Sequence, residues 1–336
     1  MTRIVSYNIL AGGYSLRDHG RRRTQELLKV IRATRPEIVG LVEAVHPQIA
    51  QKPLVVEEIA ETLGMQIITT GEYRYGNDYQ PAILTSLPIV HTHIHKHPDL
   101  LNKPLIEVCV KEANGEHLTV FLTHLSAAFD QRRGGDHLRQ HEVREILSIM
   151  APLHEQGISH LLMGDFNSLA PGDPFKASSL LRYVVSLDRK RRSFHLTDGH
   201  PHLNFVVPKP LRFLNPLLRI IPRSEVLCAL FDAAASLYVP RGSIHLLRKA
   251  GYVDCYRHRH PKEWGFTCPA AIPAGRIDFI FASPALAERL ETCDVMAEVE
   301  GLFGDDASDH LAVTAEFGTG VHPEMLSVEL DSAAIR

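Results

Sequence analysis

The chain has 336 residues, is 45% hydrophobic and carries a formal net charge of −3 at pH 7. This composition excludes an intrinsically disordered chain and allows one large domain or two small ones. The small net charge gives no global field of the kind that marks nucleic-acid or membrane binders, so any attraction for phosphate must be local.

Signals for targeting and for disulfide bonding are missing from the sequence. The start, "MTRIVSYNIL", lacks a basic segment followed by a long apolar run, and no stretch of about 18 apolar residues is free of charge. Five cysteines are scattered without C-x-x-C spacing, which disfavours a disulfide framework or a zinc site. We therefore expect a cytoplasmic protein with no transmembrane segment.

Strands and helices follow one another in the first hundred residues. Short apolar runs, some with period-two alternation, predict strands; these are residues 3–9, 37–44, 65–70 and 82–95, the last broken at Pro88. Apolar residues at helical spacing predict helices; these are residues 22–34, ended by Pro36, and 55–64, closed by Gly64.

The middle of the chain contains a strong hairpin signal. Two apolar runs within residues 105–125 flank Asn114-Gly115, a dipeptide that accepts positive φ at both turn positions. A helix is predicted from 136 to 154, followed by a buried strand that ends in "HLLM". Further strands are predicted at 276–283 and 310–317.

Strands that occur both in hairpins and in alternation with helices predict an α/β (α+β) protein with mixed sheets and helices outside. Residues 175–240 break this rhythm and contain five prolines between Pro208 and Pro240. We interpret them as an insertion that forms a partly helical flap. We expect residues 1–317 to form a single domain around this insertion, and residues 318–336 to form a C-terminal tail.

Polar residues stand at the ends of the predicted strands; they are Asn8, Glu43, His124, Asp165, Asn167, Asp278, Asp309 and His310. A single Asp or Asn in such a position commonly caps a turn, and a single half-buried His is usually hydrogen-bonded. As a set, however, the carboxylates would repel one another at a cost in stability unless a cation or mutual hydrogen bonds offset it.

The stretch "GDFNS" carries two of these residues close together. Asp165 and Asn167 are two apart, so they share one side of an extended chain, while Phe166 points to the other side and toward the core. We therefore interpret Asp165 and Asn167 as anchored functional groups rather than turn caps.

The ordered series "SYNIL", "LVE", "THL", "GDFNS", "RIDFIF" and "SDHLAV" resembles the endonuclease/exonuclease/phosphatase superfamily. This superfamily includes deoxyribonuclease I-like enzymes, exonuclease III-like repair nucleases, inositol-phosphate 5-phosphatases, neutral sphingomyelinases and poly(A)-shortening nucleases. The match spans residues 3 to 317 except the insertion. It implies a four-layered α/β/β/α sandwich of two mixed β-sheets, and hydrolysis of a phosphate ester assisted by a divalent cation.

The resemblance also implies a metal site. Glu43 would be the main ligand, with Asn8 and Asp309 nearby, and these oxygen donors suit Mg²⁺ or, as an alternative, Mn²⁺. Two positions depart from the family pattern. Val42 stands where many relatives have Gln, and we expect this difference to alter a contact that supports the ligand Glu43 rather than metal binding itself. Leu10 stands where abasic-site nucleases have Asp, which disfavours that activity.

The same resemblance implies roles for the other matched residues. Asp165 and Asn167 would orient and deprotonate the attacking water, with Asn167 also contacting phosphate. His124 would donate to a phosphate oxygen. Asp278 would hold the imidazole of His310, which would either stabilise developing charge or act in proton transfer; both roles stay open.

Three further features have structural interpretations that we favour. The histidines of "HTHIHKHP", His91, His93, His95 and His97, share one strand face, where we expect a solvated surface rather than a metal site. Basic clusters at 21–23, 189–192 and 257–260 are expected to be exposed charged surface. The apolar segment 210–222 is expected to pack against the sandwich, because its prolines disrupt an amphipathic interfacial helix.

The leading hypothesis is a Mg²⁺-dependent phosphodiesterase or nuclease that acts by in-line attack of an activated water. Nucleic acid, a phospholipid or sphingolipid headgroup and a small phosphorylated metabolite all remain open as the substrate, and a small-metabolite phosphatase is an alternative activity. A catalytically silent binding scaffold is disfavoured because every matched residue is present. No obligate protein partner is inferred.

Overall fold

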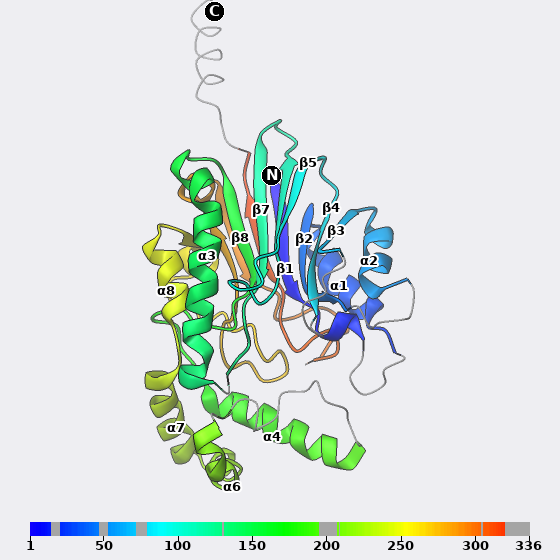
Figure 1. Cartoon of the computed structure of the whole chain (residues 1–336). Coiled ribbons are helices and arrows are strands. Elements are labelled where there is room, and N and C mark those ends of the chain that lie inside the picture. Colours follow the sequence, from blue (N-terminus) through cyan, green and yellow to red (C-terminus); the bar gives the residue numbers. More distant parts are fainter. Residues whose placement is uncertain are drawn as a thin grey trace, which may run out of the picture.

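Two mixed β-sheets form the centre of the molecule (Figure 1). The computed structural model describes residues 1–14, 21–46, 53–71, 79–129, 131–194, 207, 209–303 and 305–319, without the side chains of residues 132, 188–194, 209 and 211. Within these ranges the first sheet contains, in spatial order, β11 (Leu290–Val295), β12 (Val313–Phe317), β1 (Thr2–Asn8), β2 (Ile38–Val45), β4 (Gln80–Thr85) and β3 (Gln66–Thr69). The second contains β5 (Ile89–His95), β6 (Leu105–Lys111), β7 (His117–His124), β8 (His160–Asp165), β10 (Asp278–Ala282) and β9 (Val253–Asp254).

Each sheet has one parallel pair among antiparallel neighbours. β1 pairs in parallel with β2, and β7 pairs in parallel with β8. Parallel neighbours end at the same edge of a sheet, so the carboxyl ends of all four strands point toward one end of the molecule. That end is the lower one in Figure 1, where α4, α6 and α7 also lie.

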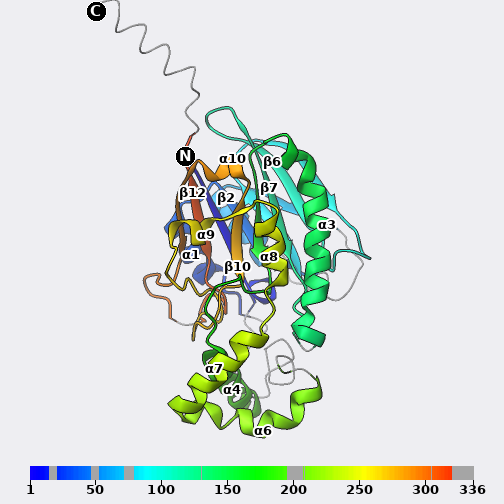
Figure 2. The same ribbon diagram turned by 90° about the vertical axis from the view of Figure 1, so that its left-hand side faces the viewer.

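Helices cover the outer face of each sheet. α1 (Thr24–Thr34) and α2 (Val55–Leu63) pack on the first sheet, and α3 (Asp136–Glu155) and α8 (Gly242–Lys249) pack on the second (Figures 1 and 2). Apolar side chains of the two sheets, among them Ile4, Ile106 and Met163, fill the space between the sheets. The predicted four-layered sandwich is therefore confirmed. Shorter elements are η1 (Ala11–Gly13), η2 (Arg132–Gly135), α9 (Cys255–Arg259) and α10 (Pro284–Ala287).

Local sequence signals explain where α2 begins and ends. The backbone N–H of Leu54 donates to Glu57 Oε2 at 2.6 Å, which pairs one of the amides left free at a helix start. The helix ends at Gly64, whose φ of 64° lies in the left-handed region that glycine adopts without steric cost. Val55, Val56 and other apolar residues of one face are fully buried, so packing on the sheet stabilises the helix.

The predicted hairpin between β6 and β7 is present, but its turn differs from the prediction. Residues 112–116 form the connection, in which Glu112 N–H donates to Glu116 O at 2.8 Å. Of the dipeptide Asn114-Gly115, only Gly115 has a positive φ, at 89°. The Asn114 side chain accepts from the Glu116 N–H at 3.1 Å, so the loop has five residues rather than the two of a type I′ turn.

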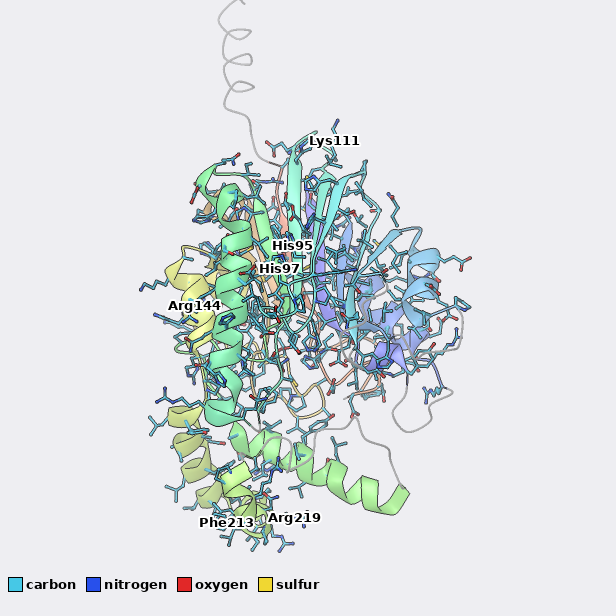
Figure 3. The ribbon with its side chains drawn as sticks, viewed as in Figure 1. His95, His97, Lys111, Arg144, Phe213 and Arg219 are labelled. Atoms are coloured by element: carbon cyan, nitrogen blue, oxygen red, sulfur yellow. The ribbon has the colours of Figure 1, made fainter. Side chains whose placement is uncertain are left out.

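The histidines of residues 91–97 lie on β5 and just beyond it, and three of them have acidic partners that the sequence did not indicate. His91 and His95 contact Glu107 of β6 at 3.2 and 2.7 Å, and His97 contacts Glu145 of α3 at 2.6 Å (Figure 3). His91 is exposed, as expected for a solvated face, but only 13% of the His95 side chain is exposed. The hydrogen bond with His95 lowers the pKa of Glu107.

Residues 175–240, insofar as they are described, are called the flap. The flap contains α4 (Ala177–Phe194), η3 (Lys209–Leu214), α6 (Asn215–Leu218), η4 (Ile221–Arg223) and α7 (Glu225–Tyr238). It lies below the strand ends in Figures 1 and 2 and has a small hydrophobic core of its own, in which Val184 of α4 is fully buried.

The prediction that residues 210–222 pack against the sandwich is wrong. They pack on α4 and α7, and Phe213, Leu217 and Ile220 remain exposed. The reason is that the prolines divide the segment into short helical turns, each of which buries only some of its apolar side chains.

Two predictions concern parts of the chain that are not described. The basic side chains of residues 189–192 lie outside the described residues, as does most of the predicted tail, 320–336. In the parts that are described, no helix combines the length and the apolar character needed to cross a membrane.

A buried ionic cluster ties the start of β10 to two other segments. The Arg276 side chain is 1% exposed, donates to both carboxylate oxygens of Asp254 at 2.6 Å and donates through Nε to Asp173 at 2.8 Å. Arg276→Gln would leave the buried Asp254 carboxylate without its charged partner and would leave Asp173 with Arg257 alone. We expect it to lower the free energy of unfolding by about 3–5 kcal/mol, measured by urea denaturation.

Arg257→Gln is the matched control for this prediction. Arg257 donates to the same Asp173 at 3.0 Å, but its side chain is 19% exposed. Its loss is therefore expected to cost below about 1 kcal/mol, as for most pairs near the surface. Equal losses for the two variants would contradict a stabilising role specific to the buried Arg276.

Candidate active site

All eight residues singled out in the sequence lie at the lower end of the sandwich, next to the flap. Asn8, His124 and Asp165 are the last residues of β1, β7 and β8, and Glu43 lies near the end of β2. The pairing register places both His124 and Asp278 directly opposite Asp165, on the two strands that flank β8. Asn167 follows β8, and Asp309 and His310 lie in the loop before β12.

Asp165 occupies the centre of this group. Its Oδ2 accepts from Asn8 Nδ2 at 3.1 Å and lies 3.8 Å from Nε2 of both His124 and His310. Only 2% of Asp165 is exposed. Burial, followed by the charge of Asp278, raises the pKa of the Asp165 carboxyl to about 7. A carboxyl with a pKa in this range is suited to exchange a proton with water near neutral pH.

The backbone around "GDFNS" is fixed by close packing. Gly164 has a φ of 141°, and a Cβ at this position would lie 1.9 Å from the Thr123 carbonyl oxygen, so only glycine fits between β7 and β8. Phe166 is fully buried and stacks edge-on against Phe279 at 5.5 Å between ring centroids. Its predicted inward direction is confirmed, and it anchors the loop between the two polar residues.

Asn167 is held in the left-handed region, with a φ of 47°. Its backbone N–H donates to Asp165 Oδ1 at 2.8 Å, and its side-chain Nδ2 donates to the carbonyl oxygen of Leu125 at 2.9 Å. Such backbone strain costs roughly 1–3 kcal/mol and persists only where surrounding contacts enforce it. Glu43, with a φ of 56°, is strained in the same way.

His310 and Asp278 form a buried pair. Asp278 Oδ2 lies 2.8 Å from Nδ1 of His310. Burial alone would lower the pKa of His310, but the charge of Asp278 outweighs it and holds this pKa well above its usual value. His310 is therefore an imidazolium at neutral pH, with Nε2–H as the donor that remains free of the pair.

His124 has the opposite character. Burial, together with the charge of Lys103, lowers the pKa of His124 well below its usual value, so its ring is neutral. Lys103 Nζ lies 3.3 Å from Nε2, and an ammonium group can only donate, which assigns the ring proton to Nδ1. Within the described residues this buried Nδ1 has no hydrogen-bond partner. It can therefore donate to a ligand.

Lys103 was missed in the sequence. It is 6% exposed and brings a positive charge to the site. A single lysine before a proline carries no periodic or motif signal, so nothing in the sequence distinguishes it from a surface residue.

The predicted metal ligands lie beside this centre. Glu43 Oε1 accepts from Asn8 Nδ2 at 3.5 Å, and Glu43 Oε2 accepts from the Ala11 N–H at 3.0 Å. Asp309 Oδ1 is buried and, among the described residues, finds no hydrogen-bond partner. Burial raises the pKa of Asp309, and the charge of Glu43 raises it further. Oxygen donors that repel one another in a buried site fit a hard divalent cation.

A second group of potential ligands overlaps the predicted catalytic residues. Asp165, Asp278 and His310 each offer one potential ligand atom, and these three atoms lie within 4.8 Å of one another. The donors in this group are two carboxylates and an imidazole, and the His310 ring already contacts Asp278 through Nδ1.

The prediction that cluster 21–23 is exposed charged surface is wrong for Arg23. Arg21 is exposed and pairs with Glu26 at 2.7 Å, but Arg23 is 6% exposed. Arg23 donates to the carbonyl oxygens of Ile9 and Ala307, and thereby joins the loop after Asn8 to the loop before Asp309. Contact with a segment 284 residues away cannot be read from a local charge run.

The cluster at 257–260 is also engaged within the protein. Arg257 donates to Asp173, and His260 contacts Asp294 at 2.9 Å. The expected exposed surface is therefore confirmed for His258 and Arg259, whereas Arg257 and His260 are half-buried and paired.

A family model, described as the Endonuclease/Exonuclease/phosphatase family, matches residues 5–310. The chain belongs to this family. Members of the endonuclease/exonuclease/phosphatase family hydrolyse phosphoric esters and in general depend on divalent metal ions, so this chain is a phosphoric ester hydrolase. A search of curated proteins gave no match.

Solved structures of the same family share the fold. An AP endonuclease from Archaeoglobus fulgidus is 18% identical, with a TM-score of 0.56 over 95% of this chain and 100% of its own. The 3′ phosphatase NExo from Neisseria, bound to a product DNA hairpin, is 17% identical, with a TM-score of 0.57 and the same coverage. Truncated TDP2 from Caenorhabditis elegans is 16% identical, with a TM-score of 0.54 over 95% of this chain and 97% of its own.

The two departures from the family pattern have different structural settings. Val42 is fully buried in the core between the sheets, away from solvent. Leu10 lines the cavity that also contains Glu43, Asp165 and His310. An apolar side chain therefore lines this cavity at the position where the resemblance implies a carboxylate in abasic-site nucleases.

Proposed function

We propose that this protein is a phosphodiesterase that hydrolyses its substrate by in-line attack of water on phosphorus, with Mg²⁺ or Mn²⁺ as the cation. The observation that carries the proposal is the position of the Asp165 carboxylate, whose Oδ2 is 3.8 Å from the imidazoles of both His124 and His310. A water held by Asp165 would lie next to the Nε2–H of His310, which can donate to a phosphoryl oxygen. We also propose that residues 1–317 act as one catalytic domain with the flap as an insertion.

The proposed reaction exchanges one oxygen substituent of phosphorus for another. The water oxygen forms a bond to phosphorus, the bond from phosphorus to the leaving ester oxygen breaks, and Asp165 takes a proton from the water. Asn167 orients the water and contacts the phosphate. The His310 imidazolium, oriented by Asp278, donates from Nε2 to a phosphoryl oxygen, and neutral His124 donates from Nδ1. The leaving oxygen takes its proton from solvent.

Glu43, Asn8 and Asp309 would hold the cation. A bound Mg²⁺ or Mn²⁺ would withdraw negative charge from the phosphoryl oxygens as it develops. Oδ1 of Asp309 supports this assignment, because within the described residues it is buried, accepts no hydrogen bond and lies 4.0 Å from His310 Nε2, so a cation would stabilise it.

Nucleic acid is one candidate for the substrate class of the proposed phosphodiesterase. The names of two structural neighbours, an AP endonuclease and a 3′ phosphatase bound to a DNA hairpin, support it. Two of the predicted basic clusters lend it no support, because Arg23 is buried and Arg257 is bound to Asp173. A small phosphorylated metabolite and a silent scaffold have no observation in their favour.

Hydrolysis of bis-p-nitrophenyl phosphate, an ester without further recognition groups, tests the proposed function. We expect Mg²⁺-dependent release of p-nitrophenolate that stops when EDTA removes the metal. His310→Gln, which removes the imidazolium, is expected to lower kcat by about 10²-fold.

The control is His245→Gln, which changes an exposed histidine on α8 and is expected to leave kcat unchanged. Equal kcat values for the wild type and His310→Gln would contradict the proposed role of His310. Turnover that EDTA leaves intact would contradict the proposed metal requirement.

A further inference from the structure

We infer that the substrate is a lipid, namely a phosphodiester with a hydrocarbon chain that lies between the flap and the sandwich. This inference rests on the proposed function, because the same Asp165 would activate the water. The water oxygen bonds to phosphorus, and the bond to one ester oxygen breaks. That oxygen leaves as the protonated alcohol, and the remaining product is a phosphomonoester. No oxidant or other co-reactant is required.

The cavity at the catalytic residues has the size and the lining for such a chain. Its volume is about 760 Å³, within the range of pockets that enclose drug-sized ligands. Apolar side chains from both the sandwich and the flap line it, among them Leu10, Leu169, Phe175, Leu218, Phe231 and Ala235. A phosphate at Asp165 would therefore have an apolar space beside it.

Charge distinguishes a lipid from a nucleic acid in this cavity. The Asp, Glu and His side chains that line the cavity all belong to the proposed catalytic and metal site. Among the described residues, no Lys or Arg lines the cavity. A nucleic acid would bring further phosphates next to the reacting one, and these are normally paired with Lys or Arg. A hydrocarbon chain needs no such partner, and its burial strengthens binding by about threefold to fourfold per methylene.

The helix α7 presents apolar side chains on two sides. Phe231 and Ala235 line the cavity. At 100° per residue, Val226, Leu230 and Leu237 fall within about 40° of one another on a different side. These three residues are 69%, 64% and 91% exposed. A helix that is apolar on nearly all sides normally lies in a protein core or in lipid, so the exposed side has the chemistry of a lipid contact.

The charged residues of α7 do not interrupt this exposed side. Among its 14 residues, Glu225 and Asp232 are the charged ones. Glu225 is the first residue of the helix, and Asp232 accepts from the backbone N–H and the hydroxyl of Ser178 at 2.6 and 2.9 Å. The charge of Asp232 is thus directed into the flap, toward the start of α4.

Apolar side chains are also exposed at the tip of the flap, in η3 and α6. Phe213 and Leu217 are 76% and 60% exposed. Figure 3 shows Phe213 and Arg219 at this tip, at the end of the molecule opposite Lys111 of the β6–β7 hairpin. Arg223, the last residue of η4, is exposed on the same segment, and an exposed arginine near exposed apolar side chains matches a lipid surface with anionic headgroups. The flap would therefore contact the surface from which the substrate chain enters the cavity.

A series of p-nitrophenyl alkyl phosphodiesters tests the chain directly, because only the alkyl length differs between its members. With methyl, butyl, hexyl and octyl esters below their micellar concentrations, we expect kcat/KM to rise at least about 100-fold from methyl to octyl. Ala235→Trp, which fills the cavity, is expected to lower the octyl-to-methyl ratio at least about tenfold. Its matched control, Ala233→Trp, changes an exposed alanine outside the cavity lining and keeps the wild-type ratio.

Sedimentation with vesicles of phosphatidylglycerol and phosphatidylcholine tests the exposed side of the flap. The wild type is expected to bind, and Leu237→Asp is expected to bind at least about tenfold more weakly. Val90→Asp is the matched control, because Val90 is a 47% exposed apolar residue on β5, outside the flap.

The outcomes separate this inference from the proposed function. Hydrolysis of the methyl ester without a rise along the series would overturn the lipid inference and leave the proposed function intact. Faster hydrolysis of a DNA or RNA oligonucleotide than of the octyl ester would also overturn the inference alone. Absence of hydrolysis for every ester would overturn both, and wild-type vesicle binding by Leu237→Asp would overturn the lipid-contact role of α7.

Discussion

Asp165→Asn is expected to lower kcat for phosphodiester hydrolysis by about 10³-fold or more, because the amide cannot accept the proton of the attacking water. The substitution keeps the shape of the side chain, and the amide oxygen can still accept from Asn8, whose Nδ2 lies 3.1 Å from Asp165 Oδ2, while the Asn167 N–H loses its acceptor. Steady-state kinetics with bis-p-nitrophenyl phosphate and saturating Mg²⁺ measure the effect. KM is expected to change much less than kcat.

The same substitution is expected to raise stability in the absence of metal. Burial and the charge of Asp278 both disfavour the ionised form of Asp165, so a neutral side chain removes an unfavourable interaction from the folded state. A higher midpoint of thermal unfolding in EDTA, together with the loss of kcat, would assign the loss to chemistry rather than to misfolding. A variant with normal kcat would rule out Asp165 as the base.

Glu43→Gln is expected to have an effect of similar size through the metal. The amide removes the negative charge of the proposed main ligand, so we expect Mg²⁺ affinity to fall by more than about 100-fold. This loss is larger than the one typical for residues that hydrogen-bond to a metal ligand. Hydrolysis at moderate Mg²⁺ is expected to fall by roughly 10³-fold. Isothermal titration calorimetry measures the affinity and does not depend on turnover.

The matched control is Glu61→Gln on α2, which changes an exposed glutamate and is expected to leave both quantities unchanged. Partial recovery of Glu43→Gln activity at high Mg²⁺ would agree with weakened binding. Unchanged Mg²⁺ affinity would show that Glu43 is not the main ligand.

The sheets and the position of the site could be predicted because their signals are local. Alternating and continuous apolar runs mark β1, β2, β7 and β8, and polar residues at their carboxyl ends are brought together by parallel pairing. β11 was not predicted, since "LETCDV" has a mixed pattern and half-exposed positions typical of an edge strand.

The surroundings of the site could not be predicted because they depend on distant contacts. Arg23 is buried only because loops near Ile9 and Ala307 enclose it, and Lys103 reaches the site only through the packing of the segment before β6. A charged residue carries the same local signal whether tertiary structure later buries or exposes it. In a similar way, the apolar run of residues 210–222 predicts burial but not the elements on which it packs.

The separate hydrophobic core of the flap has a consequence for how such a protein can change. Val184 and its neighbours in α4 pack with residues of α7 and η4, whereas the residues proposed to act in catalysis are supported by the cores of the two sheets. Substitutions in independent cores tend to have additive effects on stability. The flap can therefore diverge in shape, and with it the preferred substrate, while the machinery that breaks the ester bond keeps its geometry; the two properties are modular.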